Sequence, residues 1–190
     1  TKTIVKRGVT ELVTPGVAFN DDILKSKSNN FLAAVHFGSK ALGVSFLDVS
    51  TGEFLVSEGS AEYVDKLLQN FNPSEVLFSK QKRKLFSETF GNNYHVFHLE
   101  DWIFQTDYAF ETLTKHFDTK NLKGFGVDHL EEGIIAAGAA LHYLSETRHT
   151  KLQHISRLSR IAEDEYVWMD RFSIRNLELY HSNQQNAVTL

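Results

Sequence analysis

Hydrophobic and polar residues alternate through three short segments in the first third of the chain. The segments are FLAAVHF (31–37), ALGVSFLDVS (41–50) and GEFLVSEG (52–59), and turns rich in glycine and serine separate them. Alternation with a period of two residues is typical of β-strands, and short turns between such segments favour hairpins. The pattern therefore predicts an antiparallel meander of three strands.

Beyond Ser60, helical patterns alternate with single strands. Residues 60–71 carry hydrophobic side chains at helical spacing, with Ser60 as the expected N-cap, and Asn72 and Pro73 end the helix. The patterns that follow predict a strand at 75–80, a helix at 81–91 and a strand at 94–100. This order predicts an α/β fold: a ribonuclease H-like mixed sheet of three antiparallel strands and then two parallel strands, flanked by helices.

Two more helices are expected in the second half of the chain. The helix at 106–117 divides by spacing into a core side of Phe110, Leu113 and Phe117 and an outer side of Tyr108, Glu111, Thr112 and Lys115. A long helix from about 128 to 147 has a face of small residues, including Gly133 and Gly138. Glycine inside a helix costs about 1 kcal/mol relative to alanine, so tight packing on the sheet is expected to offset that cost.

The composition is that of an ordinary globular protein. The 190 residues are 42% hydrophobic and 23% charged, and the formal net charge of -4 gives no overall attraction for nucleic acid. The absence of cysteine excludes a disulfide scaffold, a cysteine-ligated metal site and a thiol nucleophile, and makes a cytoplasmic location the default expectation. The longest apolar run, at 134–141, falls far short of the ~20 residues that span a bilayer, so no membrane segment is expected.

A sheet of this kind makes a metal-dependent nuclease the first enzymatic hypothesis. Two-metal hydrolysis needs acidic side chains that converge from neighbouring strands and hold two ions about 3.5–4 Å apart. The first strand contains no carboxylate, and the nearest acids, Asp48 and Glu53, bracket the turn between the second and third strands. A solvated turn is the commoner role for such residues, so the nuclease is kept as an alternative.

The spacing of residues gives little support for a histidine metal site or a nucleotide-binding site. Neither His95 with His98 on a strand nor His142 with His149 on a helix has a spacing suited to one metal ion. No GxxxxGK[ST] loop occurs, and KGFGVDH (123–129) has a histidine where a dinucleotide fingerprint needs its third glycine. No catalytic, cofactor-binding or metal-binding residue is therefore predicted.

The densest basic cluster consists of Lys80, Lys82, Arg83 and Lys84. Such a cluster can contact phosphate groups, in which case binding weakens steeply with salt. A helix start that faces water explains the same residues without any ligand. Nonspecific DNA binding through Lys82, Arg83 and Lys84 stays open as a third hypothesis.

Several stretches, in collinear order, resemble the MutS family of DNA mismatch-recognition proteins. VKRGVTELVTPGV (5–17) resembles the end of the family's mismatch-binding domain, and NNFLAAV (29–35) with LGVSFLDVSTGEF (42–54) resembles the start of its connector domain. NLKGFGVDH (121–129) with the small-faced helix resembles the second half of the connector, and MDRFSIRNLEL (169–179) resembles the beginning of the core domain. The resemblance covers nearly the whole chain.

The resemblance implies four parts. These are the end of the mismatch-binding domain (1–16), a linker (17–28), a ribonuclease H-like connector domain (29–152) and the start of the core or lever domain (153–190). The family's mismatch-reading Phe-x-Glu motif belongs upstream of this segment and its phosphate-binding loop far downstream. The chain is therefore expected to be a fragment that neither recognises a mismatch nor hydrolyses ATP, with ATP and magnesium bound by the full-length parent.

By resemblance, the connector relays conformational change between the mismatch-binding and ATPase domains and offers a docking surface for MutL. That surface is expected around Tyr108, Glu111, Thr112 and Lys115, on the helix before KGFG. The other domains of the same chain are implied partners, and mismatched DNA is expected to bind only through the full-length protein. The parent is expected to be a cytoplasmic homodimer.

Overall fold

The computed structural model describes residues 30–147 and 152–161. Its elements, in order, are β1 (Phe31–Phe37), β2 (Leu42–Asp48), β3 (Phe54–Gly59), α1 (Ala61–Phe71), β4 (Glu75–Ser79), the 3-10 helix η2 (Lys80–Lys82), α2 (Arg83–Phe90), β5 (Val96–Leu99), η3 (Asp101–Phe104), α3 (Thr106–His116), η4 (Lys123–Phe125), α4 (Glu131–Thr147) and β6 (Ser159–Arg160). The parts predicted at 1–16 and 17–28, and most of the part predicted at 153–190, lie outside the described residues.

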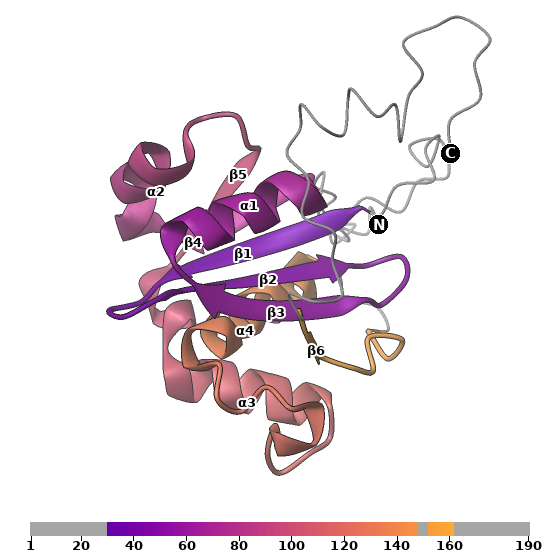
Figure 1. Cartoon of the computed structure of the whole chain (residues 1–190). Helices are drawn as coiled ribbons and strands as arrows, with labels where there is room; N and C mark the ends of the chain where they lie inside the picture. Colours follow the sequence, from indigo (N-terminus) through magenta and orange to yellow (C-terminus); the bar gives the residue numbers. More distant parts are fainter. Residues whose placement is uncertain (1–29, 148–151, 162–190) are drawn as a thin grey trace, which may run out of the picture.

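The strands form one mixed sheet in the order β5-β4-β1-β2-β3-β6 (Figure 1). β1 pairs antiparallel with β2, and β2 with β3, whereas β4 runs parallel to β1 and β5 runs parallel to β4. This order confirms the predicted ribonuclease H-like sheet of three antiparallel and two parallel strands. The short strand β6 lies parallel to β3 at the opposite edge from β5.

Helices cover both faces of the sheet, with α1 and α2 on one face and α3 and α4 on the other (Figure 1). In β1, Phe31, Ala33 and Val35 belong to the core beneath α1 and α2. Leu32 and Ala34 belong to the core against α4. Because successive side chains of a strand point to opposite faces, one alternating stretch of sequence builds both cores.

Local signals set the ends of α1 as predicted. The Tyr63 N–H donates to Ser60 Oγ over 3.2 Å, and Asn72 adopts a left-handed conformation, with φ 42°, that ends the helix before Pro73. Two other elements are shorter than predicted. The helix expected at 81–91 is split into η2 and α2, and the strand expected at 94–100 is limited to β5.

The small residues of α4 allow close packing on two sides. A Cβ added at Gly138 would lie 2.5 Å from Ala109 Cβ in α3, and one added at Gly133 would lie 2.8 Å from Val56 Cγ2 in β3. These separations leave no room for a larger side chain at either glycine. α4 thus fixes α3 to the sheet. None of the helices in the described part of the chain combines the length and the hydrophobicity that a membrane span requires.

Candidate functional site

The four residues predicted to form a docking surface lie on α3. Their spacing places them along one side of the helix. Glu111 and Lys115 are exposed, whereas Tyr108 and Thr112 are half-buried. Neither Glu111 nor Lys115 forms an ion pair with another described residue. The structure therefore brings the four residues together on one side of α3, and the two charged side chains are the most exposed of them.

The core side of α3 differs from the prediction at one position. Phe110, predicted to face the core, is 41% exposed, and Ala109 is buried instead. Leu113 is buried, as predicted, and Phe117 is half-buried just after the helix. The reason is the close approach of α4, because the contact at Gly138 leaves space only for a methyl group on α3. The prediction for Phe110 was wrong, and this side chain belongs to the outer surface.

Trp102 adds a second exposed aromatic side chain to this surface. It lies on η3, just before α3, and is 54% exposed. Its ring is edge-on to the rings of Tyr108 and His142, with centroids 4.9 and 5.4 Å away. Tyr108 Oη lies 2.6 Å from His142 Nδ1, so a hydrogen bond joins α3 to α4. We call Trp102, Tyr108 and His142 the aromatic triad.

The triad is held in a defined arrangement. Burial lowers the pKa of His142, and the nearby Glu146 opposes this effect. A neutral imidazole has one nitrogen that accepts and one that donates, so Nδ1 can accept the Tyr108 hydroxyl hydrogen. Trp102 thus rests against two rings that are fixed by a hydrogen bond between helices. An exposed indole on such a support is well suited to contact another protein.

Asp48, considered for a nuclease site, has a structural role. The prediction was a solvated turn residue, but the Asp48 side chain is completely buried. Its Oδ1 accepts hydrogen bonds from the N–H of Ser50 (2.8 Å) and the hydroxyl of Ser50 (2.6 Å), and its Oδ2 accepts one from the Asn30 N–H (3.3 Å). The bonds from Ser50 close the turn between β2 and β3, and the bond from Asn30 ties the start of β1 to the end of β2. Within residues 30–147 and 152–161, no cluster of acidic and histidine side chains is arranged to hold a metal ion.

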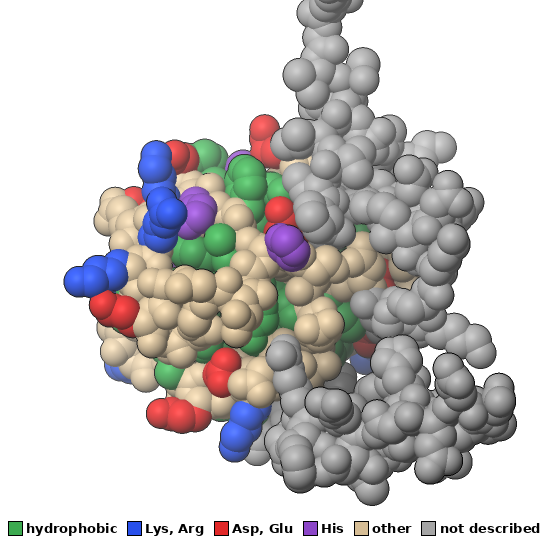
Figure 2. Space-filling model, turned by 90° about the horizontal axis from the view of Figure 1, so that it is seen from above, with side chains coloured by type: hydrophobic (Ala, Val, Ile, Leu, Met, Phe, Trp, Pro, Cys, Tyr) green, Lys and Arg blue, Asp and Glu red, His purple; other side chains and the backbone are tan. Residues whose placement is uncertain are grey.

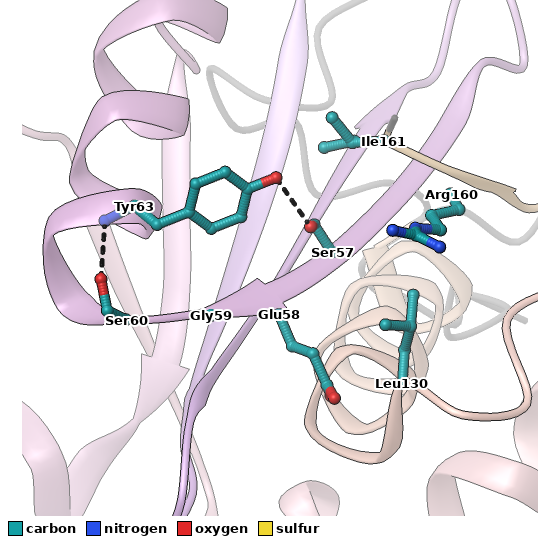
Figure 3. A pocket seen from close by; sticks show the side chains of 8 residues that line it. All are labelled: Ser57, Glu58, Gly59, Ser60, Tyr63, Leu130, Arg160 and Ile161. Carbon is teal, nitrogen blue, oxygen red and sulfur yellow. Dashed lines mark hydrogen bonds between the residues drawn. The ribbon is translucent and has the colours of Figure 1, made fainter. Parts of the chain in front are cut away.

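A cavity of about 540 Å³ opens where β3 meets β6, and Figure 3 labels the residues that line it. Its main polar groups already form bonds inside the fold. Tyr63 Oη lies 3.1 Å from Ser57 Oγ. Glu58 Oε2 accepts the N–H groups of Glu132 (2.9 Å) and Gly133 (3.2 Å), and so caps the start of α4. The chemistry of this cavity is therefore that of a helix cap, and it does not indicate a ligand.

Comparison with known proteins bears directly on the segment that carries the aromatic triad. The family model described as MutS domain II matches residues 30–156. The DNA mismatch repair protein MutS of Christiangramia forsetii is 73% identical to this chain over 190 residues, and that of Flavobacterium psychrophilum is 69% identical over 190 residues. The chain belongs to the MutS family. The resemblance in the sequence is thereby confirmed.

The chain spans about a fifth of the length of the MutS relatives that it matches. Both matches cover 100% of this chain but only 22% of each relative. The family match ends at residue 156, whereas Leu158 and Ile161 are buried against the sheet. The predicted boundary between parts 29–152 and 153–190 therefore stays a prediction.

One solved structure that matches the chain resembles the fold only distantly. The Fowlpox virus Holliday junction resolvase has a TM-score of 0.42 and 13% sequence identity, and the match covers 61% of this chain and 98% of that one. A likeness at this level bears on neither the site nor the function.

Two members of the aromatic triad were not predicted as part of the surface. Trp102 lies just before the helical pattern of α3, and this position next to the predicted surface was the signal from which its place could have been predicted. His142 lies 34 residues from Tyr108 in the chain, and no local pattern predicts their hydrogen bond. The sequence indicated the helix correctly, but the support beneath it depends on contacts between distant segments.

Proposed function

We propose that this chain is the connector segment of a MutS-type mismatch-recognition ATPase, that it relays conformational change between the mismatch-binding and ATPase domains, and that α3 docks MutL. One observation carries the docking proposal. A chain that belongs to the MutS family exposes Trp102 on a fixed aromatic support, and α3 also carries Glu111 and Lys115, which form no ion pair with another described residue. Mismatched DNA binds only the full-length parent and not this segment alone. The parent is a cytoplasmic homodimer.

The rigidity of the packing supports the proposed relay. Two cores share one sheet, and the glycines of α4 bring this helix into close contact with α3 and with β3. A body packed in this way moves as a unit when neighbouring domains rearrange, and its surface is carried with it. ATP and magnesium belong to another part of the parent, because this chain has no phosphate-binding loop of the GxxxxGK[ST] type.

The docking face combines an aromatic centre with a charged rim. Tryptophan and tyrosine are enriched among the residues that contribute most to protein interfaces. Charges at the rim of an interface contribute mainly to partner choice and association rate. Trp102 and Tyr108 are therefore the centre of the proposed MutL contact, and Glu111, Thr112 and Lys115 form its rim.

The test is a titration of the 190-residue chain with purified bacterial MutL, in which biolayer interferometry measures the affinity. Trp102→Ala is expected to weaken binding roughly tenfold or more, because it removes the central side chain. Glu111→Lys and Lys115→Glu are expected to change the affinity by a few fold and to alter its salt dependence. Lys66→Glu is the matched control, since Lys66 is exposed on α1, across the sheet from α3.

Thermal unfolding of each variant shows whether the fold is retained. Folded Trp102→Ala, Glu111→Lys and Lys115→Glu proteins that bind MutL as tightly as the parent chain would show that the face is assigned wrongly. The absence of catalysis is part of the same proposal. Incubation of the chain with magnesium or manganese and duplex or hybrid nucleic acid should give no cleavage, and cleavage would favour the metal-dependent nuclease instead.

A further inference from the structure

A cavity of about 590 Å³ lies between α2 and β5, on the face of the sheet opposite α4. Its floor is aromatic: the rings of Phe78 and Phe86 stack with centroids 4.1 Å apart, and Tyr94 lies edge-on to Phe86. Val96 and His98, which point to the same side of β5, complete the wall. The volume lies within the range of about 300–1,000 Å³ found for ligand pockets, and the floor suits a hydrophobic side chain.

The rim of this cavity is basic. None of the described residues that line it is acidic, and Arg83 and Lys84 are among them. Lys80 and Lys82 precede them directly in η2. Lys84 lies 3.7 Å from Glu88 in an exposed pair that contributes little, and no described residue forms an ion pair with Arg83. The chain as a whole carries a charge of -4, so the positive charge here is local.

Basic side chains stand next to histidine and hydrophobic side chains on the surface. In Figure 2, Lys and Arg side chains on one side of the face shown lie beside histidine and hydrophobic side chains, with Asp and Glu side chains close by. Such a combination differs from an ordinary solvated helix start, which would need no hydrophobic surface beside it. It matches a ligand that carries both negative charge and apolar groups.

His98 has an unused hydrogen-bonding group at this cavity. Its Nε2 is buried and has no hydrogen-bond partner among the described residues. Its ring is edge-on to Phe78, with centroids 4.8 Å apart. Burial, together with the charges of Arg83 and Lys80, lowers the pKa of His98, so the ring is a neutral imidazole. Buried polar atoms in folded proteins are almost always paired, so the partner of Nε2 is expected to be a water molecule or a bound molecule.

β5 also presents an unpaired edge. It lies at the end of the sheet, and among the described residues only β4 pairs with it. Val96 is 40% exposed and Phe97 is 38% exposed. Edge strands are usually protected by lysine, proline or a bulge, whereas β5 reads Val-Phe-His-Leu. Its free N–H and C=O groups can therefore pair with an added strand.

We propose that β5 and the adjoining cavity bind an extended, acidic and hydrophobic peptide segment of a partner protein. The segment pairs with the β5 edge, places an apolar side chain against Tyr94 and Val96, above the stacked rings of Phe78 and Phe86, and sets a carboxylate against Arg83 and Lys84, where it also accepts a hydrogen bond from His98 Nε2. A nucleic acid would use the basic rim but would leave the strand edge unpaired. The peptide therefore accounts for more of the site.

The test is selection from a random-peptide phage library with the 190-residue chain, with counter-selection against the double variant Arg83→Glu, Lys84→Glu. We expect enriched sequences in which acidic and hydrophobic residues alternate without a central proline. A synthetic copy of an enriched peptide should bind the double variant roughly tenfold more weakly or worse, because two cations are replaced by anions. Lys66→Glu on α1 is the matched control and should bind normally.

Hydrogen exchange locates the contact independently of the charge changes. Protection of the amides of Val96 and His98 on peptide binding is expected for strand addition, because the His95 C=O accepts the Val76 N–H of β4 and only the alternate residues face the free edge. His98→Phe should weaken binding while retaining the fold, because it keeps the aromatic ring but removes Nε2. The proposal is overturned if no selected peptide distinguishes the double variant, if protection appears on α3 instead, if oligothymidylate displaces the peptide and binds more tightly, or if the chain alone dimerises through this edge.

Discussion

At the scale of single residues, His36 shows how burial sets protonation. Its Nε2 lies 3.1 Å from Glu132 Oε2, and its ring stacks on Phe104 with centroids 5.8 Å apart. Burial and, secondly, the charge of Lys82 lower the pKa of His36 to about 4. Burial, followed by the charge of Glu58, raises the pKa of Glu132. At neutral pH the imidazole is uncharged, so this contact is a hydrogen bond rather than an ion pair.

The first prediction concerns the loss of stability in acid. His36 titrates near its ordinary value of 6.5 in the unfolded chain and near about 4 in the folded chain. The unfolded state therefore binds the proton first, and the free energy of unfolding falls as the pH decreases from 6.5 towards 4, by up to about 3 kcal/mol. In His36→Gln this contribution disappears. Denaturant midpoints measured near pH 7 and near pH 5 should then differ less for the variant than for the parent chain.

His98 and His142 add to the same acid sensitivity, because burial lowers the pKa of both. The variant should therefore reduce the pH dependence without abolishing it. His129→Gln serves as the control, since His129 is exposed. An equal pH dependence in His36→Gln and in the control would show that His36 does not carry the effect.

At the scale of elements, the pair α3 and α4 depends on one glycine. A Cβ at Gly138 would lie 2.5 Å from Ala109 Cβ and 2.6 Å from Ala109 Cα, and a backbone atom cannot move aside as a flexible side chain can. The second prediction is that Gly138→Ala destabilises the chain although alanine favours helices. Overpacking costs about 1–3 kcal/mol, and the gain in helix propensity is about 1 kcal/mol, so a net loss of about 1 kcal/mol is expected in urea unfolding.

Gly124→Ala is the matched control for this variant. A Cβ at Gly124 would have no heavy atom within 4 Å, so the substitution should leave stability nearly unchanged. A Gly138→Ala protein as stable as the control would show that α3 can move away from α4 at little cost. In that case the support of the aromatic triad would be less rigid than its geometry implies.

The sequence predicted those features of the fold that depend on residues close together in the chain. Strand alternation in β1 to β3 and the cap at Ser60 are local, and both were predicted correctly. The side of Phe110 was predicted wrongly, because helical spacing does not reveal how closely α4 approaches. The ring contacts of Trp102 with His142 likewise join distant segments. The side of Phe110 and the contacts of Trp102 depend on long-range packing, which local spacing of residues does not reveal.

At the scale of the whole molecule, the packed unit extends past residue 152. Ile155, Leu158 and Ile161 are almost completely buried. Ile161 N–H donates to the Val56 C=O over 2.9 Å, which continues the pairing of β6 with β3. His154 Nε2 lies 2.7 Å from the Val49 C=O. These contacts argue that the segment after 152 belongs to the folded unit, although the sequence predicted a boundary there.

The third prediction follows from this packing. Burial of each large aliphatic side chain stabilises the fold by about 1.5–3 kcal/mol, so the loss of three approaches the net stability of about 5–15 kcal/mol typical of a domain. A chain that ends after Leu152 should therefore melt at a clearly lower temperature than one that ends after Ile161, as followed by circular dichroism. Leu158→Ala in the 190-residue chain should cost about 2–5 kcal/mol and gives the same answer without a new terminus. Equal melting of the two shortened chains would place the boundary at 152, and the buried residues beyond it would then be a covering layer that the connector does not need.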